Sequence, residues 1–241
     1  MKPIYIPSGK AKEYGDYALN IYTGCPHRCY YCFAPSVLHK DREAFHSCVE
    51  PRTDIYEATM AQLDKEGITG KLIHLCFSCD PYPLGVDNII TRDIIKLLKN
   101  AGNHVQILTK NGIGAQRDFD LLDGEDWFGV TYAGYSTSPV LPPPEEPNAG
   151  WAIDRFRALV LAKNSGIKTW VSCEPVLNAK SIFSLIRNGS YIDRFKIGKL
   201  NYHPSDINWH DFGYEVERLC KEYGRDYYIK EALRNEMTRP E

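Results

Sequence analysis

The sequence predicts an α/β fold, a partial (βα)6 TIM-like barrel with parallel strands, in a single domain over residues 1–241. Short apolar runs alternate with stretches of helical periodicity, which is the pattern of parallel strands joined by helical crossovers. The length of 241 residues, with 43% hydrophobic and 25% charged residues, suits one globular core. We expect that core over about residues 15–200, followed by a further helix and an extra strand in residues 205–241.

The expected strands and helices follow one another along the whole chain. Short apolar runs predict strands at residues 18–22, 71–77, 105–108, 128–131, 169–172, 195–197 and 227–229. Apolar positions at helical spacing predict helices that begin near Asp54, Thr91, Gln116, Ala152 and Asn178, and a last long helix around Val216. Asp54 with Glu57 has the pattern of a capping box, and Thr91 is the expected N-cap of the second helix.

Loop lengths indicate which end of the strands carries the site. Connections from helix to strand are short, whereas residues 24–53, 78–90 and 132–150 form long connections from strand to helix. Parallel α/β folds bind ligands at the carboxyl ends of their strands, where these long loops gather. The Pro-rich segment 138–147 is expected to be stiff, as either a lid or a surface spacer.

Composition narrows the class of protein and its compartment. No stretch is apolar enough to span a membrane, and the N-terminus lacks the apolar core of a secretory signal, which predicts a cytoplasmic protein. Eight cysteines in a reducing compartment favour metal or redox chemistry over disulfides. The formal net charge of -2 offers no general attraction for nucleic acid, so charge does not support a nucleic-acid substrate.

Three cysteines crowd into the segment from Asn20 to Pro35. Cys25, Cys29 and Cys32 are close enough for one loop to present all three thiolates to one zinc ion or iron–sulfur cluster. Structural sites of both kinds normally take four protein ligands, so three leave one metal position open, as in catalytic sites. The alternative is a closed zinc site in which Cys48 is the fourth ligand.

The spacing C-x-x-x-C-x-aromatic-C, with Tyr31 as the aromatic residue, resembles the motif of the radical S-adenosylmethionine enzymes. The lead-in from Asn20 to Gly24 and later dipeptides resemble the spore photoproduct lyase-like branch, over roughly residues 15–200. The resemblance implies a 4Fe-4S cluster on the three thiolates and S-adenosylmethionine on the fourth iron. It also implies reductive release of a 5'-deoxyadenosyl radical and an electron donor such as flavodoxin or ferredoxin.

The same resemblance implies hydrogen abstraction from an unidentified substrate, with a nucleic-acid base as one candidate. A different class stays open, namely a zinc-bearing or iron–sulfur-bearing binding protein without radical chemistry. The radical enzyme requires a fourth metal position that is open to a small ligand, whereas the binding protein does not. The sequence leaves both classes open.

Polar residues that follow the predicted strands are candidates for holding S-adenosylmethionine. Asp80 is expected to accept from its ammonium group, Lys110 to pair with its carboxylate, and Thr131 to bind its ribose. The remaining cofactor-binding candidates are Tyr31, Ser78 and Glu174.

Two further cysteines are candidates for returning a hydrogen atom to the product radical. The resemblance points to the second strand region, where Cys79 is the expected site residue and Cys76 the expected core residue. Side chains alternate along a strand and three positions separate the two cysteines, so they are not expected to share a side. Cys173, at the end of the fifth strand, is the second candidate donor.

Overall fold

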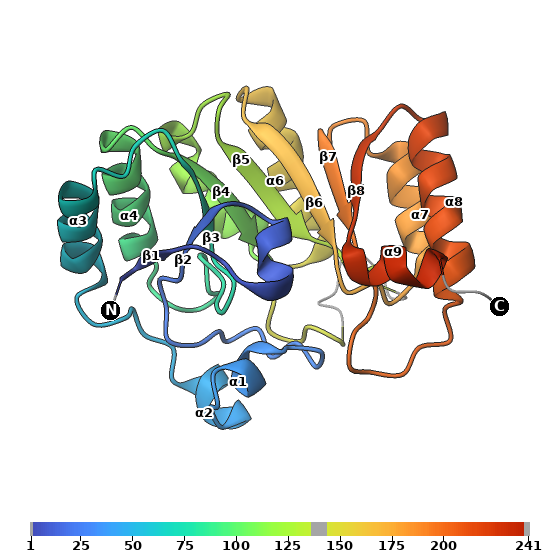
Figure 1. The fold of residues 1–241 in the computed structure, drawn as a ribbon, viewed down its shortest axis with the longest axis horizontal. Helices are drawn as coiled ribbons and strands as arrows, with labels where there is room; N and C mark the ends of the chain where they lie inside the picture. The colour runs from blue at the N-terminus through green and yellow to red at the C-terminus, as the bar shows by residue number, and fades with distance from the viewer. Residues whose placement is uncertain (1, 136–143, 239–241) are drawn as a thin grey trace.

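The computed structural model describes residues 2–135 and 144–238, so most of the predicted Pro-rich lid or spacer lies outside the described residues. Eight strands form one sheet in the order of the chain, as Figure 1 shows. The strands are β1 (Ile4–Tyr5), β2 (Tyr17–Leu19), β3 (Leu72–Leu75), β4 (His104–Thr109), β5 (Trp127–Thr131), β6 (Lys168–Cys173), β7 (Arg194–Ile197) and β8 (Asp226–Ile229). Strands β2 to β8 are parallel to one another, and β1 pairs with β2 in the antiparallel direction. The predicted partial barrel with parallel strands is confirmed, and the sheet is not closed.

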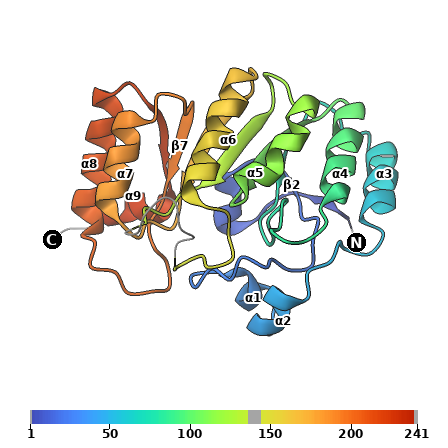
Figure 2. The ribbon, with the colours of Figure 1, turned by 180° about the vertical axis from the view of Figure 1, so that it is seen from behind.

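Helices connect successive strands and cover one face of the sheet, which Figure 2 shows from behind. They are α3 (Ile55–Glu66), α4 (Ile89–Asn100), α5 (Gly112–Ala115), α6 (Ala152–Asn164), α7 (Ala179–Asn188) and α8 (Trp209–Glu222). The shorter elements are α1 (Ala34–Val37), α2 (Arg42–Ser47), α9 (Glu231–Met237) and the 3-10 helices η1 (Gly9–Glu13) and η2 (Gln116–Leu121). No helix in the described residues is long and apolar enough to cross a membrane.

The two faces of the sheet differ in chemistry. Ile73, Val105 and Val171 pack with the buried side chains of the helices in one continuous core. Alternation along the strands turns His74 and Trp170 to the other, concave face. There His74 Nδ1 hydrogen-bonds Gln106 at 2.9 Å. The concave face is therefore polar, although it is almost wholly buried.

The N-terminal segment that contains Glu13 and Tyr14 covers this concave face and bridges the two ends of the sheet. The Tyr14 ring packs against His74 and Trp170, with ring centroids 5.4 and 5.9 Å away. Lys196 Nζ donates to the carbonyls of Glu13 and Tyr14 at 3.0 and 3.1 Å. Glu13 also accepts from the N–H of Glu231, just beyond β8, at 2.7 Å. The segment thereby links the first strands to the last ones across the opening of the barrel.

The predicted cap at Thr91 is wrong, and Asp54 is at the N-cap position of α3 but does not cap the helix through its side chain. Helix α4 begins after Asn88, and Thr91 lies inside the helix, where its Oγ1 donates to the Pro81 carbonyl at 2.6 Å. Asp54 does precede α3, but its φ of 53° is left-handed and its side chain makes no capping hydrogen bond. A tertiary contact of Thr91 and the left-handed backbone of Asp54 take the place of the expected capping hydrogen bonds.

Two other features bear on the site. The second predicted strand ends at Leu75 rather than residue 77, so Cys76 and Cys79 both lie in the loop that follows β3. The first long loop contains α1 and α2, which form a small lobe below the carboxyl ends of the strands in Figure 1.

Candidate active site

The loop with the three cysteines is braced by a single arginine from helix α2. The Arg42 guanidinium donates to the carbonyls of Cys29, Tyr30 and Cys32 at 2.6, 2.9 and 3.2 Å. Charged donors make stronger hydrogen bonds than neutral ones, and here one planar group bonds three carbonyls of the loop. The backbone of the loop is therefore fixed without using any of the thiols.

A close backbone contact fixes the start of the loop. A Cβ atom on Gly24 would lie 2.2 Å from the Phe45 carbonyl oxygen, which only glycine avoids. The next N–H, of Cys25, donates to that same carbonyl at 3.2 Å. His46 Nδ1 hydrogen-bonds the Cys25 carbonyl at 2.7 Å. Glycine at this position lets α2 pack directly on the first cysteine.

The three thiols share one cation. Burial raises the pKa of all three, that of Cys29 to about 12, while the nearby ammonium of Lys110 lowers each of them. Lys110 Nζ also lies 5.6 Å from the centre of the Tyr31 ring. Buried thiols ionise only beside positive charge, which a bound metal supplies more strongly than a lysine. Three such thiols on one loop are a donor set that fits a 4Fe-4S cluster.

Asp80 lies buried beside this loop and joins β3 to β4. Its Oδ1 accepts from Thr109 Oγ1 at 2.6 Å and from the N–H of Tyr82 at 2.8 Å, and its Oδ2 accepts from the N–H of Lys110 at 2.8 Å. His27 Nδ1, inside the cysteine loop, lies 3.5 Å from Oδ2. Asp80 therefore connects the ends of both strands to the loop.

His27 is buried as a neutral ring. Its Nε2 accepts from the N–H of Leu84 at 3.2 Å, so the ring proton is on Nδ1, which forms no hydrogen bond within the described residues. Burial lowers the pKa of His27 to about 4, although the Asp80 charge opposes this shift. The histidine is a structural contact rather than a metal ligand in this arrangement.

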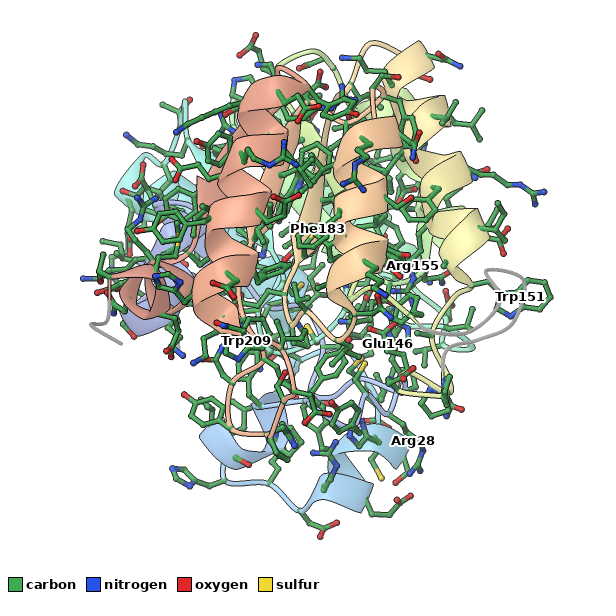
Figure 3. The ribbon with its side chains drawn as sticks, turned by 90° about the vertical axis from the view of Figure 1, so that its right-hand side faces the viewer. Arg28, Glu146, Trp151, Arg155, Phe183 and Trp209 are labelled. Atoms are coloured by element: carbon green, nitrogen blue, oxygen red, sulfur yellow. The ribbon has the colours of Figure 1, made fainter. Side chains whose placement is uncertain are left out.

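A buried ion pair lies on the other side of the loop. Glu146 and Arg155 are both fully buried, with Arg155 Nη2 2.6 Å from Glu146 Oε2. Tyr135 OH donates to the same oxygen at 2.6 Å, and Tyr31 OH donates to Oε1. Figure 3 shows Glu146 and Arg155 side by side between the helices and the lobe that carries Arg28. The aromatic residue of the cysteine motif is thus held by a buried charge.

The backbone around Glu146 makes further contacts with the loop. The N–H of Tyr30 donates to the Glu145 carbonyl at 3.1 Å. Asn148 donates from its N–H to the His27 carbonyl at 3.3 Å and from its side chain to the Pro26 carbonyl at 3.2 Å. Residues 145–150 therefore support the cysteine loop along its length.

The other predicted cofactor-binding residues have different surroundings. Within the described residues, the buried Ser78 hydroxyl has no hydrogen-bond partner, which is uncommon for a buried polar group. Thr131 is buried, and its carbonyl accepts from Arg155 at 2.9 Å. Glu174 lies on the concave face, where it accepts from Tyr14 OH at 3.0 Å and pairs with Lys230. Their roles toward S-adenosylmethionine stay predictions.

Cys173 ends β6, as the sequence predicts, and its role as a second hydrogen donor stays a prediction. The preceding Ser172 faces the concave side and contacts Tyr14 OH at 3.2 Å. Alternation therefore turns Cys173 toward the helices, where it is fully buried near Cys220 of α8. Cys79 is partly exposed and lies beyond β3, and its predicted role stays a prediction.

Sequence reasoning missed Glu146, Arg155, Arg42 and His27. Arg155 had a readable signal, because it lies on the same helical face as Ala152 and Leu159, where a charged side chain is buried only with a partner. The others have no such signal, since they occur in loops or short helices whose contacts depend on the tertiary structure.

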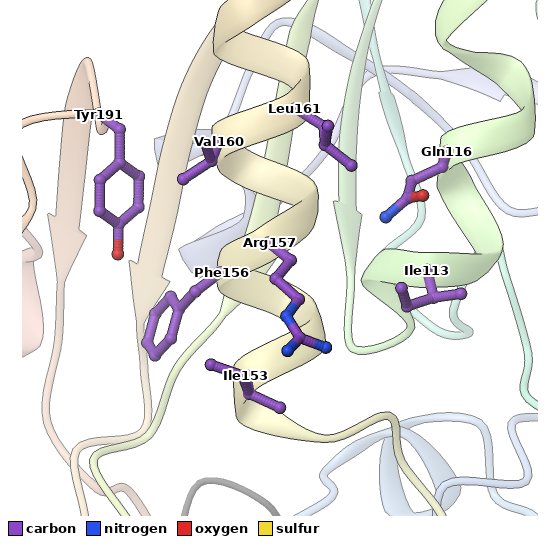
Figure 4. Close-up of a pocket in the computed structure, with 8 residues that line it drawn as sticks. All are labelled: Ile113, Gln116, Ile153, Phe156, Arg157, Val160, Leu161 and Tyr191. Carbon is purple, nitrogen blue, oxygen red and sulfur yellow. The ribbon is translucent and has the colours of Figure 1, made fainter.

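A groove of about 500 Å³ lies apart from this site. Figure 4 shows it along the outer side of α6, where Ile113, Phe156, Val160 and Leu161 are among its mostly apolar lining residues. None of its eight lining residues is a candidate from the sequence. The chemistry of the cysteine loop is therefore separate from the groove.

Comparisons with known proteins give matches among solved structures. No family model and no curated protein matches the chain. A spore photoproduct lyase variant with bound AdoMet and dinucleoside spore photoproduct has a TM-score of 0.66 at 12% identity, and the match covers 93% of this chain and 79% of that chain. Streptococcus suis SuiB bound to S-adenosylmethionine has a TM-score of 0.58 at 13% identity, covering 88% of this chain and 50% of SuiB.

SuiB bound to its precursor peptide SuiA gives a similar match, with a TM-score of 0.59. At 12 to 13% identity these matches establish the fold. The chain therefore shares the fold of spore photoproduct lyase and of SuiB.

Proposed function

We propose that this chain is a radical S-adenosylmethionine enzyme, in which Cys25, Cys29 and Cys32 hold a 4Fe-4S cluster. The observation that carries the proposal is the set of three thiols on one braced loop at the carboxyl ends of parallel strands. Cys29 is buried, Cys25 and Cys32 are partly buried, and all three lie near Lys110. When bound, the cluster supplies the electron that splits S-adenosylmethionine and releases a 5'-deoxyadenosyl radical. The radical abstracts a hydrogen atom from the substrate.

The chain's own polar groups suit a zwitterionic cofactor at this place. A carboxylate offers about four acceptor positions, and Asp80 uses three of them within the protein, which leaves one for an ammonium group. Lys110 is a cation beside the three thiols and suits the carboxylate of the methionine moiety. The unpartnered hydroxyl of Ser78 is a further donor for the cofactor.

The substrate class stays unassigned, because the structural neighbours act on different molecules. One neighbour binds a dinucleoside spore photoproduct and another binds a precursor peptide. A nucleic-acid base, a peptide and a small molecule are therefore all candidates here, and a net charge of -2 does not favour duplex DNA. A flavodoxin or ferredoxin is the proposed electron donor.

Anaerobic reconstitution with iron and sulfide tests the proposal. The expected product is a brown protein with about four irons per chain. It should release 5'-deoxyadenosine only when S-adenosylmethionine and a reductant are both present. A colourless protein with one tightly bound zinc, and no 5'-deoxyadenosine, would support the alternative of a zinc-binding protein instead.

Two matched variants separate a three-cysteine cluster from a closed zinc site. Cys48 is exposed at the carboxyl end of α2, whereas Cys29 is buried within the loop. Cys48→Ala should keep full iron content, and Cys29→Ala should lose the cluster. Loss of metal in Cys48→Ala would contradict the proposal, because it would make Cys48 the fourth protein ligand.

A further inference from the structure

The sequence Cys76-Phe77-Ser78-Cys79 places two cysteines three positions apart beside the site. Strand β3 ends at Leu75, so the four residues form a loop and the alternation of a strand does not separate the two side chains. The two thiols are close enough for each to shift the pKa of the other, that of Cys76 upward and that of Cys79 downward. This Cys-x-x-Cys spacing is that of redox-active dithiols, in which the two sulfurs are near enough to form a disulfide.

Backbone contacts hold this loop in place from the neighbouring strand. The Asn20 side-chain oxygen accepts from the N–H of Phe77 at 2.7 Å and from the N–H of Ser78 at 2.9 Å. The N–H of Tyr22 donates to Cys79 Sγ at 3.4 Å. These contacts use neither thiol as a hydrogen-bond donor.

The two cysteines differ in access. Cys79 is partly exposed, whereas Cys76 is 5% exposed. Burial raises the pKa of Cys79, but hydrogen bonds from the Cys76 thiol and the Tyr22 N–H, with the charge of Arg52, outweigh it and lower the pKa. Arg52 has no ion pair within the described residues, and its buried Nε has no hydrogen-bond partner there. An accessible, ionisable thiol beside a buried one is the arrangement of an attacking and a resolving cysteine.

We propose that Cys76 and Cys79 form a redox-active dithiol, which a small-molecule disulfide of the glutathione class converts into an intramolecular disulfide. The Cys79 thiolate attacks one sulfur of the small disulfide, forms a mixed disulfide and releases one thiolate. Cys76 then loses its proton to that thiolate and attacks the Cys79 sulfur, which releases the second half of the small disulfide as a thiolate that takes up a proton from water. The protein pair is oxidised by two electrons, and the small disulfide is reduced to two thiols.

The disulfide itself requires no metal or S-adenosylmethionine. Its consequence for catalysis rests on the proposed function, because an oxidised Cys79 has no hydrogen atom to return to a product radical. The dithiol is the expected form in a reducing compartment, and oxidation would suspend turnover reversibly.

Peptide mass analysis tests the disulfide directly on the cluster-loaded protein. Trypsin cleaves after Lys71 and Arg92, so residues 72–92 form one peptide in which Cys76 and Cys79 are the only cysteines. After anaerobic incubation with glutathione disulfide and alkylation under denaturing conditions, this peptide should be two hydrogen atoms lighter and carry no alkyl group. Prior reduction should restore two alkyl groups. Cys173, buried and alone in residues 169–180, is the internal control and should be alkylated throughout.

Two conservative variants test the roles of the pair. Cys76→Ser should keep one glutathione on Cys79, because nothing resolves the mixed disulfide, and Cys79→Ser should leave Cys76 unmodified. Two alkyl groups on the wild-type peptide at every glutathione ratio, or a glutathione that persists on it, would overturn the proposal. Neither readout depends on iron content or on 5'-deoxyadenosine, so failure here is distinct from failure of the proposed function.

Discussion

Replacing Arg155 by methionine tests how strongly the buried ion pair supports the cysteine loop. Arg155 donates to Gly150 O at 3.0 and 2.8 Å, to Thr131 O at 2.9 Å and to Glu146 at 2.6 Å, with no exposed surface. Removing one partner of a buried pair costs about 3–5 kcal/mol, because the other charge is left uncompensated. Glu146 keeps its hydrogen bonds from two tyrosine hydroxyls, so we expect the lower end, about 3 kcal/mol.

Thermal unfolding of the reconstituted protein measures this loss. For a chain of this size each kcal/mol lowers Tm by about 2–4 °C, so Arg155→Met should lower Tm by about 6–12 °C. Arg157→Met is the matched control in the same helix, because the Arg157 side chain is 66% exposed and its nearest carboxylate oxygen, on Asp154, is 3.4 Å away. The control should lose less than about 1 kcal/mol.

A double variant separates the ion pair from general damage to helix α6. In Arg155→Met with Glu146→Gln no buried charge remains unpaired, so it should be more stable than the sum of the two single losses predicts. Both single variants should also lose iron faster to a chelator, because Glu146 holds the Tyr31 hydroxyl in the cysteine loop. A Tm for Arg155→Met within about 2 °C of the parent would refute the assigned role of the pair.

Three further perturbations test the loop and the concave face. Gly24→Ala should lower the free energy of unfolding by about 1–3 kcal/mol and reduce iron content, because the new Cβ would lie 2.2 Å from the Phe45 carbonyl oxygen. Full iron content in this variant would contradict the importance of this contact. Arg42→Met should speed iron loss to a chelator, since three loop carbonyls lose their donor, and unchanged loss would argue against the brace. Burial lowers the pKa of His74 to about 3, whereas a histidine in the unfolded chain has a pKa of about 6.5. Between these values only the unfolded chain takes up a proton, so the free energy of unfolding decreases as the pH falls below about 6.5. Between pH 7 and pH 5, denaturant unfolding should show about 2 kcal/mol more loss for the parent than for His74→Gln, and equal losses would rule out a neutral buried His74.

The fold could be predicted from the sequence because its strands and helices have strong local signals. The run at residues 169–172 has Trp170 on one side and Val171 on the other, as suits a parallel strand buried on both faces, and it forms the centre of β6. The antiparallel pairing of β1 could not be predicted, because two residues are too few for a period. Cap predictions were wrong where a side chain had a tertiary partner, as Thr91 does.

The site was predictable only where chemistry depends on spacing. Cys25, Cys29 and Cys32 are recognisable because three ligands on one loop must be close in sequence. The contact between Glu146 and Tyr31 joins residues 115 positions apart, and no local pattern signals such a pair. The meeting of Cys76 and Cys79 depended on where β3 ends, which is the least reliable part of a sequence-based prediction.

The proposed function depends most on one iron of the cluster having no protein ligand. Mössbauer spectroscopy of the protein reconstituted with iron-57 measures this directly, before and after S-adenosylmethionine is added. We expect three of the four irons to keep thiolate-type spectra and one to change when the cofactor binds, equally in the parent and in Cys48→Ala. Four irons that all remain unchanged on addition of S-adenosylmethionine would contradict the account.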